Sequence, residues 1–88
     1  MTFSITARYP TNRSTVLVLR GVIDYDSARV LRAAISAAVA RRPMPRLIVV
    51  DLQAVTSVND VGVGTLVVAG RICQDIGISL VVRHPSPA

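Results

Sequence analysis

The sequence lacks the residue types from which most catalytic and metal sites are built. It has one cysteine, Cys73, and one histidine, His84. A single cysteine excludes an internal disulfide and a cysteine-based zinc site. His84 lies in a short segment with two prolines, so no Ser-His-Asp or Cys-His set can be assembled on rigid elements. We therefore predict that the protein is not an enzyme and uses no cofactor and no metal.

Long apolar runs are also absent. No run approaches the roughly 20 residues needed to span a bilayer. The N-terminal residues 1–4 lack the basic start and apolar stretch of a signal peptide. A lone cysteine suits a reducing compartment. We expect a cytoplasmic protein that does not contact a membrane.

The sequence has neither lysine nor glutamate, so its permanently charged side chains are arginine and aspartate alone. Ten arginines and five aspartates give a formal charge of +5. Such a balance is compatible with nucleic-acid binding. However, the arginines are spread along the chain apart from Arg41, Arg42 and Arg46, and no aromatic residues are interleaved with them to stack on bases. We interpret the charge as a solvated surface, which argues against nucleic acid as the main partner.

What remains is a chain that is 51% apolar, and whose core must come from valine, leucine, isoleucine and alanine. A length of 88 residues fits one domain, which we place at residues 3–83, with 84–88 as a tail. Hydrophobic periodicity predicts strands and helices in alternation. The expected strands are 3–9, 16–19, 47–50 and 78–82, and the expected helices are 28–42 and 61–76.

The order β-β-α-β-α-β indicates an α/β fold with a mixed sheet and two helices. The first two strands should form an antiparallel hairpin, and the strand–helix–strand connections require parallel pairing. The sequence leaves open whether both helices lie on one face of the sheet. Residues 52–59 are expected to form a loop. Asp26 or Ser27 is expected to cap the first helix.

Each helix shows an apolar face at helical spacing. In the first helix, the predicted inward residues are Leu31, Ile35, Ala38 and Val39, and Arg41 and Arg42 should fall in its last turn. In the second helix, the predicted inward residues are Val63, Leu66, Val67, Gly70, Cys73 and Ile76.

The start of the second helix is chemically unusual. Asp60 places a carboxylate where free backbone N–H groups favour negative charge. Gly62 and Gly64 follow it, although glycine costs about 1 kcal/mol relative to alanine within a helix. One interpretation is that a partner packs close to this backbone. The other is that Asp60 is an ordinary N-cap and the glycines fit against a neighbouring loop.

Several motifs in this order resemble the STAS domain, the fold of bacterial anti-sigma factor antagonists that regulate transcription. The family pattern reads roughly G-x-hydrophobic-D, then hydrophobic-D-L-(S)-x-V-x-x-(I/M)-D-S-(S/T)-G-(L)-G. Here it is matched by Gly21-Val22-Ile23-Asp24, by the run from Leu47 to Leu52, by Val55, and by the run from Val58 to Gly64. The spacing from Asp51 to Gly62 matches without a gap. The resemblance covers residues 3–83.

The resemblance implies a non-catalytic module that binds an anti-sigma factor of the serine-kinase type. In the family, phosphorylation of the D-S-(S/T)-G motif breaks that complex. By resemblance and by the chemistry of the helix start, the partner-binding residues are Asp24, Ser57, Asn59, Asp60, Val61, Gly62 and Val63.

This sequence departs from the family at the phosphorylated position. Asn59, Asp60 and Val61 replace Asp, Ser and Ser or Thr, so no phosphoacceptor remains at the motif. Ser57 and Thr65 are the nearest hydroxyls, and both are out of register. We therefore expect binding without a phosphorylation switch. The alternative is a scaffold or sensory STAS domain that binds other STAS proteins or a small ligand such as a nucleotide.

Family members usually continue past the last strand with another helix, and we expect this fold to lack that helix. An apolar strip left uncovered would favour self-association, so a homodimer is an additional expectation.

Overall fold

Six elements follow one another in the predicted order, and a computed structural model describes them over residues 3–83. The predicted tail 84–88, with His84, lies outside the described residues. The elements are β1 (Ser4–Thr11), β2 (Ser14–Ile23), α1 (Tyr25–Val39), β3 (Leu47–Val58), α2 (Asp60–Asp75) and β4 (Ser79–Arg83).

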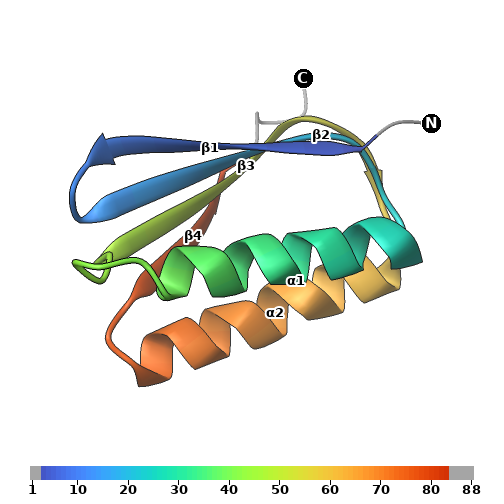
Figure 1. Cartoon of the computed structure of the whole chain (residues 1–88). Helices are drawn as coiled ribbons and strands as arrows, with labels where there is room; N and C mark the ends of the chain where they lie inside the picture. The colour runs from blue at the N-terminus through green and yellow to red at the C-terminus, as the bar shows by residue number, and fades with distance from the viewer. Residues whose placement is uncertain (1–2, 84–88) are drawn as a thin grey trace.

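One mixed sheet carries the fold, with the strands in the order β1-β2-β3-β4. β1 and β2 form the predicted antiparallel hairpin, whereas β2–β3 and β3–β4 are parallel. Both helices lie on the same face of this sheet (Figure 1), which answers the question that the sequence left open. Alternate residues of β2, including Thr15, Leu17 and Leu19, are buried under the helices.

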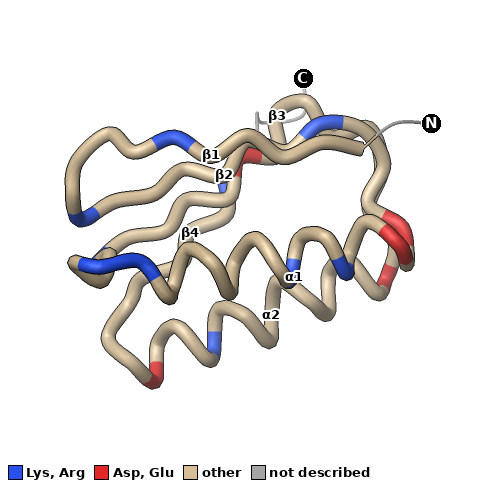
Figure 2. Tube along the Cα trace, in the orientation of Figure 1, with Lys and Arg blue, Asp and Glu red and all other residues tan. Residues whose placement is uncertain are grey.

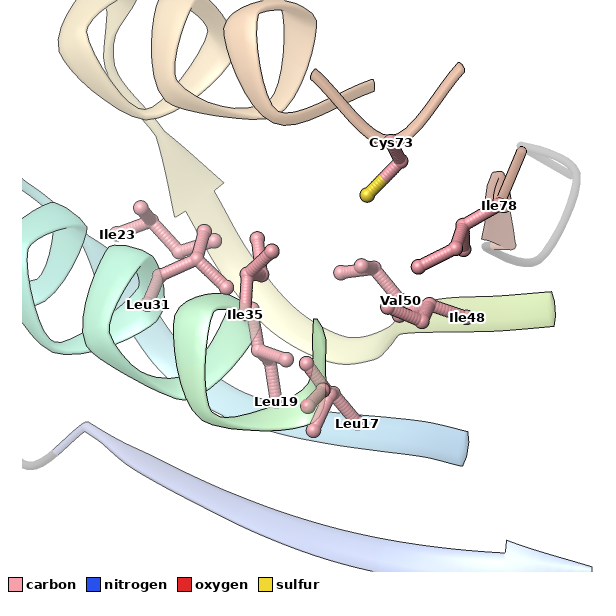
Figure 3. Close-up of a cluster of buried hydrophobic side chains, with 10 residues drawn as sticks. Leu17, Leu19, Ile23, Leu31, Ile35, Ile48, Val50, Cys73 and Ile78 are labelled. Carbon is pink, nitrogen blue, oxygen red and sulfur yellow. The ribbon is translucent and has the colours of Figure 1, made fainter. Parts of the chain in front are cut away.

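The core lies between the sheet and the two helices and is almost entirely aliphatic (Figure 3). Leu19, Leu31 and Ile48 have no exposed surface, and each such side chain contributes about 1.5–3 kcal/mol through burial. Cys73 projects into the same cluster, where burial raises the pKa of its thiol. A buried, protonated thiol is a poor nucleophile, so Cys73 acts as a packing residue.

The first helix starts and ends earlier than predicted. Its N-cap is Asp24, and the prediction of Asp26 or Ser27 is wrong. The Asp24 carboxylate accepts hydrogen bonds from the Ser27 backbone N–H (3.0 Å) and the Ser27 hydroxyl (2.9 Å). At the other end, Arg42 lies beyond the last turn, and its Nη1 donates to the carbonyl oxygens of Val39 (3.4 Å) and Arg41 (2.9 Å). The predicted inward face of this helix is confirmed.

The loop predicted at 52–59 is wrong, because β3 continues through these residues as far as Val58. The pairing with β2 shifts register twice, between Val18 and Arg20 and again between Gly21 and Val22. Each shift places an additional β3 residue opposite β2, as in a β-bulge. Bulges interrupt the two-residue alternation on which strand prediction depends.

The buried face of α2 differs from the predicted one. Val63, Val67 and Ile76 were expected to point inward, yet they are 51%, 57% and 42% exposed. Gly62 and Cys73 are the buried residues, and Leu66 and Ala69 pack partly against the core. Because α2 has apolar residues around most of its circumference, its periodicity does not select a face. Contacts with the strands make that choice.

Candidate partner-binding site

The candidate site lies at the end of the sheet where both helices begin. Since β2 and β3 are parallel, their carboxyl ends meet at one edge, the usual place for sites in α/β folds. α1 starts directly after β2, and α2 starts directly after β3 (Figure 1). The backbone N–H of Asn59 donates to the carbonyl of Ile23 at 3.0 Å. This hydrogen bond joins the β3–α2 connection to the end of β2.

Asn59 and Asp60 have different roles at the start of α2. Asn59 is the N-cap, and its Oδ1 accepts a hydrogen bond from the Gly62 N–H at 2.9 Å. Asp60 is therefore not the cap. It is the first residue of the helix, and its side chain is exposed. The Asp60 carboxylate lies at the positive end of the helix dipole, where a negative charge is stabilised, and it remains accessible to a partner.

The two glycines of this helix have different environments. A Cβ atom on Gly62 would lie 2.6 Å from Ile23 Cγ2 and 2.9 Å from Val58 Cγ1, which is too close for either pair of atoms. On Gly64 the same atom would have no neighbour within 4 Å. Gly62 thus lets α2 pack on the sheet and presents no contact surface, while Gly64 has open space beside its backbone and lines the space between the two helices.

The other predicted site residues lie around the same edge. Asp24 is exposed, although its carboxylate is already engaged as the α1 cap. Ser57 is exposed near the end of β3, paired with Val22. Val61 and Val63 are 45% and 51% exposed on the first turn of α2. Apart from the buried Gly62, each predicted residue is exposed and lies at or near the start of a helix.

Three aspartates cluster at this edge, and we call Asp24, Asp26 and Asp60 the acidic corner. All three lie at the start of a helix. Figure 2 shows acidic positions at the end of the molecule where the helices start, and basic positions around the β1–β2 turn and the α1–β3 connection at the opposite end. Asp26, in the first turn of α1, was not among the predicted site residues. Its position two residues after Asp24 is the signal that could have identified it.

A groove between the helices adjoins the acidic corner, and the sequence did not predict it. This interhelical groove has a volume of about 600 Å³. Val61 lies at its end nearest the corner, and Val68 and Ile72 continue along α2. Arg32 and Ser36 of α1 supply polar groups on the other wall. The combination of an acidic end and apolar walls suits a partner that presents both apolar and basic side chains.

Two aspartates have a lowered pKa. For Asp24, the cause is the pair of hydrogen bonds from the Ser27 backbone and hydroxyl. For Asp51, the main cause is the hydrogen bond from the Gln53 N–H (2.9 Å), and the ion pair with Arg83 (3.1 Å) lowers the pKa further against the opposing effect of burial. Both carboxylates therefore stabilise the folded protein in their charged form.

Acidification should destabilise the fold through these two groups. Because their pKa values are lower in the folded state than in the unfolded one, the unfolded state binds more protons as the pH falls, and the free energy of unfolding decreases. The loss should begin around the ordinary aspartate value of about 3.9 and continue below it. Urea unfolding from about pH 7 to pH 3 measures it. The Asp24→Asn/Asp51→Asn variant, which cannot titrate at these positions, should show a shallower dependence, and parallel curves would contradict the assignment.

Solved structures with the same fold include anti-sigma factor antagonists. The unphosphorylated form of SpoIIAA, from Bacillus, matches with a TM-score of 0.78 at 21% identity, over 96% of this chain and 76% of that one. An antagonist from Mycobacterium paratuberculosis matches with a TM-score of 0.77 at 25% identity, over 99% of this chain and 71% of that one. The structure described as Mglu matches with a TM-score of 0.79 at 25% identity, over 92% of this chain but only 19% of that one.

The class of protein is thus a STAS-type binding module with the architecture of the antagonists, as the motifs implied. The family model described as "Mlab, STAS domain" matches residues 8–88, and the chain belongs to this family. A search of curated protein sequences found no match. Within residues 3–83, neither helix has the length and apolar character needed to cross a membrane.

Proposed function

We propose that the protein binds an anti-sigma factor of the serine-kinase type through the acidic corner and the adjoining end of the interhelical groove, without catalysing a reaction. One observation carries the proposal. Asp60 is exposed as the first residue of α2, at the position where the resembling antagonist motif has its serine.

The charge at this position explains why phosphorylation would not control binding. A phosphoserine carries about −1.5 to −2 charges and three acceptor oxygens, whereas an aspartate such as Asp60 offers a single negative charge and two oxygens. SpoIIAA is known in phosphorylated and unphosphorylated forms. In the present chain, Asp60 gives this position one constant charge, smaller than that of a phosphoserine, in place of a phosphorylated and an unphosphorylated form. The affinity for the partner is therefore fixed by the sequence.

Apolar side chains beside the charge supply the remaining contact surface. Val61 and Val63 are about half exposed on the first turn of α2, and Val68 and Ile72, further along the groove, are 57% and 55% exposed. Charged groups at the edge of an interface mainly steer encounter and select partners, while buried apolar groups supply most of the affinity. We therefore assign selection to Asp60 and affinity to the valines.

Reversing the charge at Asp60 should weaken binding about tenfold or more, which corresponds to about 1.4 kcal/mol. Isothermal titration calorimetry of wild type and Asp60→Arg with a serine-kinase anti-sigma factor from the same genome measures this change. The matched control is Asp75→Arg, which makes the same replacement at an exposed position at the far end of α2 and should leave the affinity unchanged. Equal losses in the two variants would contradict the assignment of the corner.

A second experiment separates the switch from the binding. Asp60→Ser restores the hydroxyl at the motif position, so incubation with the kinase and ATP should add one phosphate that mass spectrometry detects. Wild type should gain none at this site. Phosphate on wild-type Ser57 or Thr65 would show that a substitute acceptor is used, and the proposed permanent state would be wrong.

The interhelical groove favours a second candidate function, a sensory domain that binds a small ligand such as a nucleotide. Its volume is of the size that small ligands occupy, and Arg32 could pair with a phosphate group. NMR shifts confined to the groove on addition of ATP would support this function, and shifts absent at millimolar ATP would contradict it.

Assembly with another STAS protein or with a second copy is the corresponding scaffold function. The exposed Val63 and Val67 support it, since they lie one helical turn apart on α2 and leave apolar surface on this helix. A monomeric mass by light scattering at high concentration would exclude the homodimer.

A further inference from the structure

A second groove lies on the other side of α1, between this helix and the edge strand β1. Its volume is about 790 Å³. The α1 wall consists mainly of alanine, with Ala33, Ala34 and Ala37, and the β1 wall includes Phe3 and Ile5. Because the alanine side chains are short, they leave the inner face of β1 incompletely covered. We call this space the β1–α1 groove.

One end of the β1–α1 groove carries a positive charge in a defined position. The guanidinium carbon of Arg41 lies 3.7 Å from the centre of the Tyr9 ring, and both residues line the groove. Stacking on an aromatic ring holds the guanidinium plane, while its N–H edge remains free to bind an oxyanion in bidentate fashion. The only ion pair formed within residues 3–83 joins Arg83 and Asp51. Arg41 is therefore not paired with a carboxylate of this part of the chain.

The surroundings of Arg41 also favour an anion. Arg42 donates to the carbonyl of Val39, the last residue of α1, and to that of Arg41 just beyond it, and thereby offsets the negative end of that helix. Arg46 is held beside the β1–β2 turn, since its backbone N–H donates to the carbonyl of Arg13 at 2.7 Å. The acidic corner lies at the opposite end of the molecule (Figure 2). The potential at this end of the groove is therefore positive.

We propose that the β1–α1 groove binds a fatty acid, with its alkyl chain between α1 and β1 and its carboxylate on Arg41. The volume and mostly apolar lining are those of a small-ligand site with few polar groups. Charge complementarity identifies the head group, because the lining contains a single charged residue and it is basic. A nucleotide fits less well, since its base and sugar require polar partners along walls that are largely alanine.

The selectivity for head and tail can be measured with three probes. Dodecanoate, added below its critical micelle concentration, should produce saturable ¹H–¹⁵N NMR shifts at Ala33, Ala34 and Ala37. Acetate has the head group without the chain, and dodecyltrimethylammonium has the same chain with the opposite charge. Neither should saturate over the same concentration range. Equal binding of the cationic probe would overturn the proposal, because it would show apolar adsorption without recognition of the carboxylate. The absence of saturable shifts with dodecanoate would overturn it as well.

Two variants and a matched control test the residues. Arg41→Gln should weaken dodecanoate binding at least tenfold, since it removes a charge-assisted bidentate contact. Arg46→Gln removes the same charge at the same end of the molecule from a residue outside the groove lining, and should change the affinity less than twofold. Ala37→Leu fills the groove at an exposed helical position where leucine is well tolerated, and should abolish binding while the melting temperature is kept. Equal effects of Arg41→Gln and Arg46→Gln would show non-specific attraction and overturn the site, as would full binding by Ala37→Leu.

Discussion

Replacing Gly62 with valine should destabilise the protein by about 3 kcal/mol, whereas the same replacement at Gly64 should have almost no effect. At Gly62 the first added carbon already lies 2.6 Å from Ile23 and 2.9 Å from Val58. Ile23 is fully buried and branched at Cβ, so it cannot move aside cheaply, and overpacking of this kind typically costs about 1–3 kcal/mol. For a domain of this size, each kcal/mol lowers the melting temperature by about 4–8 °C.

Gly64 is the matched control because it lies on the same helix, two residues further on, with open space around its Cα. Valine is a somewhat better helix former than glycine, so Gly64→Val should be neutral or stabilise slightly. Urea denaturation followed by circular dichroism measures both variants. Similar losses at the two positions would show that the contact with Ile23 does not explain the effect, and the packing of α2 described above would be wrong.

Replacing Leu31 with alanine should cost about 3–4 kcal/mol. Leu31 has no exposed surface and lies within the core between α1 and the sheet (Figure 3). Truncation of a buried leucine removes apolar contact and leaves a cavity, with a typical cost of about 2–5 kcal/mol. A chain of this length has a total stability of roughly 4–13 kcal/mol, so the variant loses a large part of it and is expected to melt many degrees lower.

The adjacent residue provides the comparison. Val30 is 52% exposed, and alanine is the better helix former, so Val30→Ala should change the free energy of unfolding by less than about 0.5 kcal/mol. Thermal and urea unfolding of the two variants measure the difference. If Val30→Ala were as destabilising as Leu31→Ala, α1 would have to be rotated relative to the sheet.

The elements that the sequence predicted well are those with a local signal. On α1, the apolar residues Leu31, Ile35 and Ala38 recur at helical spacing among exposed arginines, so periodicity alone identifies the buried face. The order of strands and helices follows from similar local patterns. The parallel pairing then follows from the connections, because a strand–helix–strand unit returns in the same direction.

The features that the sequence missed depend on contacts between distant segments. The second half of β3 is paired with β2 through two shifts of register, and nothing in residues 52–58 taken alone shows a partner strand. α2 is apolar on most sides, so its buried face is chosen by Gly62 against Ile23 and Val58. The Asp24 cap was missed for a smaller reason, since three candidate cap residues occur within four positions.

In the candidate site, too, features with a local signal were predicted and features formed by distant segments were missed. The Asn59-Asp60-Val61 segment stands out in the sequence because a carboxylate and two glycines meet at a helix start. The two grooves do not stand out, since each is formed by residues of separate elements. The positive end of the β1–α1 groove in particular comes from the stacking of Arg41 on Tyr9, residues that lie far apart in the chain.

The fastening of Asn59 to Ile23 has a consequence for the entropy of recognition. The backbone N–H of Asn59 donates to the end of β2, and the Asn59 side chain caps α2 by accepting from the Gly62 N–H. Gly62 in turn packs on Ile23. The start of α2 has no hinge in this arrangement, so a partner meets a surface whose backbone is already ordered. Preorganised surfaces avoid the cost of ordering a loop on binding and usually dock with little backbone movement. Complex formation at this corner should therefore resemble the docking of rigid bodies.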